Sequence, residues 1–198
     1  MKPTRPDARF ASLRSALVLF LLLSALTGFL YPLIVTGLAQ LLFPAQAAGS
    51  ILMRNGQPVG SRLIGQSFSD PGHFWSRPSA TLPQPYNGLA SGGSNLGPLN
   101  PALTDVVKAR IAALRAADPD NTAPVPIDLV TASGSGLDPD ISVAAAQYQA
   151  ARVARAHGLA LARVRALIAA HSKGSVAAIL GEPRVNVLEL NLAVDGLK

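Results

Sequence analysis

Two short polar segments contain the residue types from which a binding site could be built. Residues 133–136 read Ser-Gly-Ser-Gly, and such a turn before a helix can present backbone amides to a phosphate. No lysine follows this segment, so a plain tight turn is the competing interpretation. Residues 118–121 and 138–140 hint at calcium loops but lack the glutamate at the twelfth position. Their composition favours turns and helix caps.

The three histidines are candidates for a hydrolytic site. His73, His157 and His171 are far apart in sequence, but His157 and His171 could approach each other across a helix hairpin. Such a pair would allow an anchored hydrolase in which one histidine acts with a nearby serine or aspartate. The alternative is that both histidines end helices and complement the helix dipole.

Several classes of function are disfavoured by what the sequence lacks. There is no Walker A motif, dinucleotide-binding glycine motif, nucleophile elbow, zincin motif or Asp-Lys-Thr-Gly phosphorylation motif. The absence of cysteine excludes disulfides and thiolate metal sites. The net charge of +6 comes with few aromatic residues and no facing basic cluster, so nucleic-acid binding is disfavoured. On these residues alone, the chain is an anchored, non-enzymatic domain.

A long uncharged stretch near the N-terminus predicts a transmembrane helix. No charged residue occurs between Ser15 and Met53, and residues 15–42 are dense in apolar side chains. As a helix, these residues would span about 42 Å, which exceeds the roughly 30 Å hydrocarbon core of a bilayer. We therefore expect tilt or a kink, and Pro32 is the natural place for one.

The flanks of this helix predict its orientation. Four basic residues precede it, whereas none follows closely until Arg54; the four are Lys2, Arg5, Arg9 and Arg14. The positive-inside bias then gives a cytoplasmic arm at 1–14, a transmembrane helix at 15–42 and an extracytoplasmic domain at 43–198. Ala45-Gln46-Ala47 resembles a signal-peptide cleavage site, which would leave a free secreted binding protein. The apolar run is about twice the length of a signal peptide's apolar core, which favours a retained anchor.

The first half of the outer domain carries strand and turn signals. Asn55-Gly56 predicts a hairpin over 51–59, because this pair favours the positive φ angles of a type I′ turn. Further strands are expected over 62–68 and, buried, over 126–131. Residues 69–101 are rich in turn formers, and we expect an ordered loop that buries its large aromatic residues, Phe74, Trp75 and Tyr86.

The helix signals lie mainly in the second half. Asn100-Pro101 opens a helix that ends at residues 118–119, and further helices are expected over 142–157, stopped by Gly158, and over 161–171. Asn186 and Glu189 resemble a capping box of a last helix, although a strand over 185–192 is the alternative. The mixture predicts an α+β fold.

Distinctive segments along the whole chain resemble the C subunit of the Kdp-type potassium-transporting ATPases of bacteria. The departures are small: Ala48 stands where asparagine is usual, and Val143 where proline is usual. The segments that carry the resemblance are Tyr31-Pro32-Leu33, Gln46-Ala47, Gly49-Ser50, Leu63-Ile64-Gly65-Gln66, Arg77-Pro78-Ser79-Ala80, Ser91-Gly92-Gly93-Ser94-Asn95-Leu96, residues 130–138, Gln149, Arg152-Val153-Ala154 and residues 185–191.

This resemblance implies a non-catalytic accessory subunit in the inner membrane. Its implied partners are a channel-like potassium-binding subunit and a P-type ATP-hydrolysing subunit, which together import potassium. The helix would pack against partner helices, for which Ser24 and Gly28 form a small-residue pair. The family is described as a catalytic chaperone that raises the ATP affinity of the hydrolysing subunit. The implied nucleotide-contacting candidates are Gln149, Ser133, Gly134, Ser135 and Gly136.

The implied ATP role conflicts with the predicted orientation. ATP is cytoplasmic, whereas the basic arm places Gln149 outside the membrane. A glutamine on an alanine-rich helix could equally bond a neighbouring backbone or a partner subunit. An outside role would be to stabilise assembly or to cover the potassium entrance of the channel-like subunit.

Overall fold

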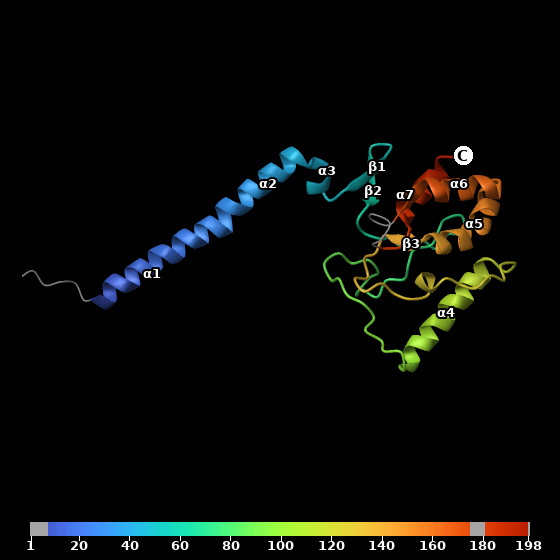
Figure 1. Ribbon diagram of the computed structural model, residues 1–198, viewed down its shortest axis with the longest axis horizontal. Coiled ribbons are helices and arrows are strands. Elements are labelled where there is room, and N and C mark those ends of the chain that lie inside the picture. Colours follow the sequence, from blue (N-terminus) through green and yellow to red (C-terminus); the bar gives the residue numbers. More distant parts are fainter. Residues whose placement is uncertain (1–7, 175–180, 198) are drawn as a thin grey trace, which may run out of the picture. The chain divides into compact units, whose positions relative to one another are not determined.

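The computed structural model describes residues 8–174 and 181–197, and it divides the chain into two units after Ser50. Residues 1–7 of the predicted basic arm, including Lys2 and Arg5, lie outside the described residues. The fold is mixed helix and sheet, as predicted, with an N-terminal apolar helix followed by an α+β domain (Figure 1).

The first unit is a nearly continuous helix. It comprises α1 (Ala8–Ala25), a π-helical turn (Leu26–Leu30), α2 (Tyr31–Leu42) and the short α3 (Pro44–Ala47). Within it, Ser12–Leu42 is long and apolar enough to cross a membrane, with a mean hydropathy of 2.3. This confirms the predicted transmembrane-length helix.

The irregularity expected at Pro32 lies in the turn that precedes it. Proline has no amide hydrogen, and its ring would clash with the carbonyl group four residues earlier, that of Gly28. The π-helical turn widens the helix here, and the Tyr31 amide donates to the Leu26 carbonyl five residues back.

The second unit begins with a hairpin of β1 (Ile51–Arg54) and β2 (Gln57–Ser61), paired antiparallel. Asn55 and Gly56 have φ angles of 52° and 77°, which confirms the predicted type I′ turn. The next 39 residues, 62–100, contain no helix or strand. The prediction of a strand over 62–68 is therefore wrong. The Gly65 amide bonds to the Leu137 carbonyl, and the Gln66 side chain bonds to Val59, so no strand ladder is available.

The segment that follows contains α4 (Pro101–Ala117) and a short 3-10 helix (Ile127–Leu129). The Asn100 side chain caps α4 by accepting from the Ala102 amide at 3.0 Å, as predicted. A strand over 126–131 was the wrong prediction. The Ile127 carbonyl accepts the amides of Val130 and Thr131, so the backbone closes on itself although Leu129 and Val130 are buried.

The core is built from short strands and three helices. The sheet has the antiparallel order β3 (Asp140–Ser142), β5 (Arg184–Asn186), β4 (Ser172–Lys173). The helices gathered beside it in Figure 1 are α5 (Val143–His157), α6 (Leu161–His171) and α7 (Val187–Asp195). The fully buried residues of these helices and of β5 include Ala145, Ala150, Val153, Val164, Ile168, Val185, Leu190 and Val194. The alanines on α5 let its backbone approach its neighbours closely.

The helix ends follow the predicted signals. Ser142 caps α5, and Gly158 ends it with a φ of 64°, a conformation that glycine adopts without strain. Asn186 caps α7 by accepting from the Glu189 amide at 3.0 Å. The helix prediction for this segment is thus confirmed, and the alternative strand is limited to β5.

Candidate functional site

Gln149 lies inside the domain and holds the backbone of the long loop. It is only 1% exposed on α5. Its Oε1 accepts from the Trp75 amide at 2.7 Å, and its Nε2 donates to the Trp75 carbonyl at 3.1 Å. Nε2 also donates to the Ala145 carbonyl at 3.3 Å. Every polar atom of this side chain therefore has a partner within the fold.

Asn191 on α7 repeats this arrangement one residue earlier in the loop. Its Oδ1 accepts from the Phe74 amide at 2.8 Å, and its Nδ2 donates to the Phe74 carbonyl at 3.0 Å. Asn191 is 2% exposed and Phe74 is fully buried. We call Gln149 and Asn191 the amide clamp. The clamp supplies to two consecutive loop residues the hydrogen bonds that strand neighbours would otherwise give.

Arg152 completes this buried network. Its Nη2 donates to Gln149 Oε1 at 2.7 Å, and its Nη1 donates to the Pro71 carbonyl. The guanidinium carbon lies 4.8 Å from the centre of the Trp75 ring, within cation–π range. Burial lowers the pKa of Arg152 to about 10. Since its hydrogen-bond partners here are neutral oxygens, this charge serves to order the loop.

The Ser-Gly turn predicted to contact a nucleotide is bonded to the same loop. Ser133 Oγ accepts from the Gly136 amide at 2.8 Å. The Ser135 carbonyl accepts from the Gly92 amide at 2.9 Å and from Ser91 Oγ at 3.0 Å. Gly136 has a φ of 68°, and a Cβ there would lie 2.6 Å from the Gly92 carbonyl oxygen. This glycine is needed for the close approach of the two segments.

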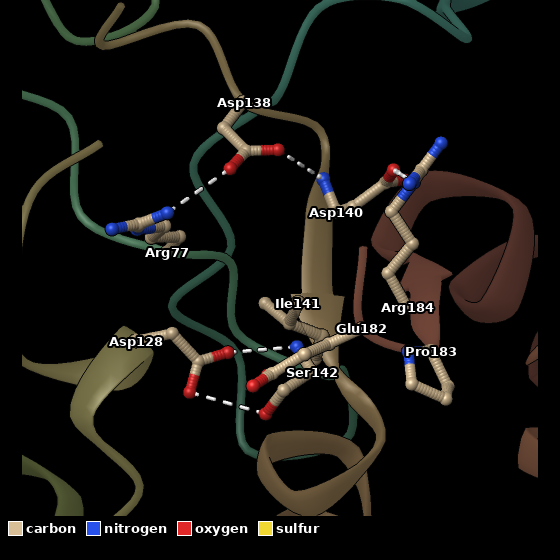
Figure 2. A pocket seen from close by; sticks show the side chains of 9 residues that line it. All are labelled: Arg77, Asp128, Asp138, Asp140, Ile141, Ser142, Glu182, Pro183 and Arg184. Atoms are coloured by element: carbon tan, nitrogen blue, oxygen red, sulfur yellow. Dashed lines mark hydrogen bonds and ion pairs between the residues drawn. The ribbon is translucent and has the colours of Figure 1, made fainter. Parts of the chain in front are cut away.

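Downstream of the turn, charged residues line a small pocket of about 190 Å³ (Figure 2). Arg77 Nη1 lies 3.2 Å from Asp138, and Arg184 Nε lies 2.7 Å from Asp140. Asp128 accepts from the Ser142 amide at 2.7 Å at the start of α5. With Glu182, four carboxylates face two guanidinium groups. This excess of negative charge disfavours a polyphosphate in the pocket.

The two predicted nucleotide-contacting groups both bond to the segment 62–100, Gln149 at Trp75 and the Ser-Gly turn at Ser91 and Gly92. Within the described part of the chain, no hydrogen bond joins Gln149 to the Ser-Gly turn.

Sequence reasoning missed Asn191 as a residue of this site. Its signal was a polar side chain on the apolar stripe of α7 formed by Val187, Leu190 and Val194.

The histidines occupy structural positions. His157 and His171 are the last residues of α5 and α6, and Nε2 of His157 pairs with the Gly72 carbonyl at 2.8 Å. His73 Nε2 lies 3.2 Å from Asp195 Oδ1, and the His73 and His157 rings are 6.4 Å apart. The histidine hydrogen bonds run to Asp195 and to the carbonyls of Gly72 and Leu167, and the described residues hold no group of three metal-ligating side chains.

An apolar helix of membrane-spanning length followed by a small α+β domain fits the class of domains anchored in a membrane by a single helix. Comparison with known proteins agrees with this class. The family model described as "K+-transporting ATPase, c chain" matches residues 13–196. The chain therefore belongs to the KdpC family, the c chains of potassium-transporting ATPases.

Individual relatives cover nearly the whole chain. The potassium-transporting ATPase KdpC subunit of Polaromonas naphthalenivorans is 70% identical over 186 residues, which are 94% of this chain and 95% of the relative. The KdpC subunit of Variovorax paradoxus is 70% identical over 183 residues, 92% of this chain and 95% of the relative. That of Methylibium petroleiphilum is 67% identical over 184 residues, with 93% and 96% covered. Membership in this family implies that other subunits accompany the chain.

Proposed function

We propose that this chain is the non-catalytic accessory subunit of an ATP-driven, high-affinity potassium import complex. Its partners are a channel-like potassium-binding subunit and a P-type ATP-hydrolysing subunit. The helix Ser12–Leu42 anchors it among the membrane helices and lipid, and the α+β domain stabilises the assembled complex from outside.

The observation that carries this proposal is that Gln149 is buried and that all of its side-chain polar atoms are already hydrogen-bonded within the domain. A nucleotide could bond to Gln149 only after its side chain released the Trp75 backbone, Ala145 and Arg152. Releasing them would leave buried polar groups without partners, at about 1–3 kcal/mol for each group. The bonds of Ser133 and Ser135 within and beside the Ser-Gly turn favour a structural role there as well.

Orientation supports the same role. Lys2, Arg5, Arg9 and Arg14 lie at the N-terminal end of the apolar helix and favour a cytoplasmic N-terminus, which leaves the domain on the opposite side from ATP. From there, the domain can hold the partners together, or cover the potassium entrance of the channel-like subunit. The catalytic-chaperone role that the family resemblance implies, with Gln149 and residues 133–136 raising ATP affinity, requires the opposite orientation or an indirect effect.

A cysteine-labelling experiment tests the orientation. The chain has no cysteine, so Ser135→Cys introduces a single reactive site at an exposed position. In intact spheroplasts, a membrane-impermeant maleimide should label Ser135→Cys but not the control Thr4→Cys. After permeabilisation, both variants should react. Labelling of Ser135→Cys only after permeabilisation would defeat the outside assignment and restore the direct ATP role.

Co-purification tests the accessory role itself. The full chain, expressed with its partner subunits, should be retained with a tagged ATP-hydrolysing subunit in mild detergent. A stable solitary chain under these conditions would contradict the proposed function.

A further inference from the structure

We propose that an uncharged surface formed by Leu63, Leu82, Leu89 and the hollow beside them binds an uncharged, apolar loop of another subunit of the complex. We call this surface the neutral patch. The proposal rests on the accessory function stated above, and it assigns one face of the domain to that function.

The first support is the absence of charge over a long stretch of sequence. Residues 78–104, from Pro78 to Thr104, contain no Asp, Glu, Lys or Arg, although such residues make up 14% of the chain. Connecting segments run over the surface, where Asp, Glu, Lys and Arg are mostly found. The part of this stretch that is exposed therefore carries no charge, which suits burial against a partner, because charged residues are depleted at the core of interfaces.

Two leucines of this stretch, Leu82 and Leu89, are exposed and are linked through one side chain. Leu82 is 76% exposed and Leu89 is 98% exposed. One side chain bridges them, because Asn87 Nδ2 donates to the Leu82 carbonyl at 2.9 Å while Asn87 Oδ1 accepts from the Leu89 amide at 3.1 Å. Two large apolar side chains are thus presented from one fixed turn.

The patch continues onto the segment after β2. A Cβ on Gly88 would lie 3.6 Å from Ile64 Cδ1, which places the turn against Ile64. The neighbouring Leu63 is 62% exposed. Beside them is a hollow of about 420 Å³ that includes Ile64, Gln66, Pro85 and Tyr86 in its lining, and none of its described lining residues is charged. Burial raises the pKa of Tyr86, so this phenol stays neutral as well.

Charge complementarity indicates the kind of occupant. The charged residues that border the patch are satisfied internally, since Arg62 pairs with Glu189 and Arg77 pairs with Asp138. A charged partner segment would find no counter-charge here and would lose its hydration. Anionic lipid headgroups are poor candidates for the same reason, and the patch lacks the basic residues that interfacial helices use. An uncharged apolar loop of another subunit fits best.

The patch is already ordered before any partner binds. Thr81 Oγ1 donates to the Gln84 carbonyl at 2.8 Å and accepts from the Asn87 amide at 3.0 Å. Ser79 Oγ accepts from the Tyr86 amide at 2.9 Å, and the Tyr86 hydroxyl donates to the Arg77 carbonyl. Little conformational entropy remains to be lost on binding, which favours specific docking.

Introducing a charge tests the proposal. Leu82→Asp and Leu89→Asp are made in the full chain, expressed with the other subunits, and recovery with a tagged ATP-hydrolysing subunit is measured at equal membrane levels. We expect each variant to lower recovery at least tenfold. The matched control is Ile127→Asp, because Ile127 is 74% exposed but lies on the 3-10 helix. The control should assemble as the native chain does. An unchanged thermal unfolding midpoint for each purified variant shows that folding is not the cause.

Crosslinking identifies the occupant. A benzophenone amino acid at position 89 should crosslink under ultraviolet light to another subunit of the complex. Crosslinks only to a second copy of this chain, or only to lipid, would overturn the proposal. If the native chain assembles and both aspartate variants assemble equally well, the proposal fails while the accessory function stands. If the native chain does not assemble, the accessory function itself fails.

Discussion

Gln149 bonds to Trp75 at both of its backbone polar groups, across 74 residues of sequence. This pairing, repeated by Asn191 and Phe74, fastens an irregular loop to two core helices. The loop has no helix or strand of its own between residues 62 and 100, so its order depends on side chains from elsewhere. Residues essential for the shape of the α+β domain therefore look, in sequence, like binding residues.

Replacing Gln149 tests its structural role. Gln149→Leu leaves the Trp75 amide and carbonyl buried without partners, and we expect a loss of about 3 kcal/mol in the free energy of unfolding. Trp75 is the only tryptophan, so its fluorescence reports denaturant unfolding of the full chain in detergent directly. The matched control is Gln147→Leu on the same helix, which should change stability by less than about 0.5 kcal/mol.

The same variant separates the structural role from nucleotide contact. Within the assembled complex, Gln149→Leu should reduce the amount of intact complex but leave the KM for ATP of the remaining complex unchanged. A raised KM for ATP in a variant of native stability would contradict the structural assignment and favour the family-implied ATP role.

Arg152→Met should be less damaging than Gln149→Leu. The substitution removes a buried charge whose pKa burial has lowered to about 10, and it leaves the two bonds between Gln149 and Trp75 in place. The Pro71 carbonyl loses its donor, so we expect a loss of about 1–2 kcal/mol. The exposed Arg163→Met is the control in the same unfolding assay. A loss equal to that of Gln149→Leu would make Arg152 the principal anchor instead.

Local signals made part of this fold predictable. Asn100, Ser142 and Asn186 were expected at helix starts and are found there, because a cap bonds to an amide two or three residues away. The apolar helix was predictable from composition alone. The strand predicted over 62–68 failed because the Gly65 amide bonds to Leu137, far along the chain, and apolar spacing contains no information on that partner.

The candidate site was also predictable only in part, because its hydrogen bonds join residues that are far apart in the sequence. The resemblance identified Gln149 and residues 133–136 as important, but it did not show what they touch. Asn191 and Phe74 are 117 residues apart in sequence, and no spacing rule connects them. Burial of Phe74 was expected from its size, whereas the bonding of its backbone by a side-chain amide needed the tertiary structure.

Asp195 should make the stability of the α+β domain fall at acid pH. Burial raises the pKa of Asp195, but hydrogen bonds from Arg54 and His73 outweigh this effect, and the pKa is lower than its ordinary value. As the pH falls through about 4, the unfolded carboxylate binds a proton before the folded one, so stability falls. Asp195→Asn should reduce the slope of unfolding free energy against pH between about 5 and 3. An unchanged slope would show that Arg54 and His73 do not stabilise the ionised form.

Gly28 should contact a partner helix. Among residues 8–174 and 181–197, a Cβ on Gly28 would meet nothing within 4 Å beyond the helix's own backbone, so a larger side chain there causes no clash with them. Gly28→Leu also removes a poor helix former and should leave the anchor helical and inserted. If Ser24 and Gly28 allow a partner helix to approach closely, the added bulk should separate the two helices and lower co-purification of the complex about tenfold. Leu22→Phe adds bulk where a large side chain already stands, and it should assemble normally. Equal recovery of Gly28→Leu and native chain, both measured against the tagged ATP-hydrolysing subunit, would place the packing face of the helix elsewhere.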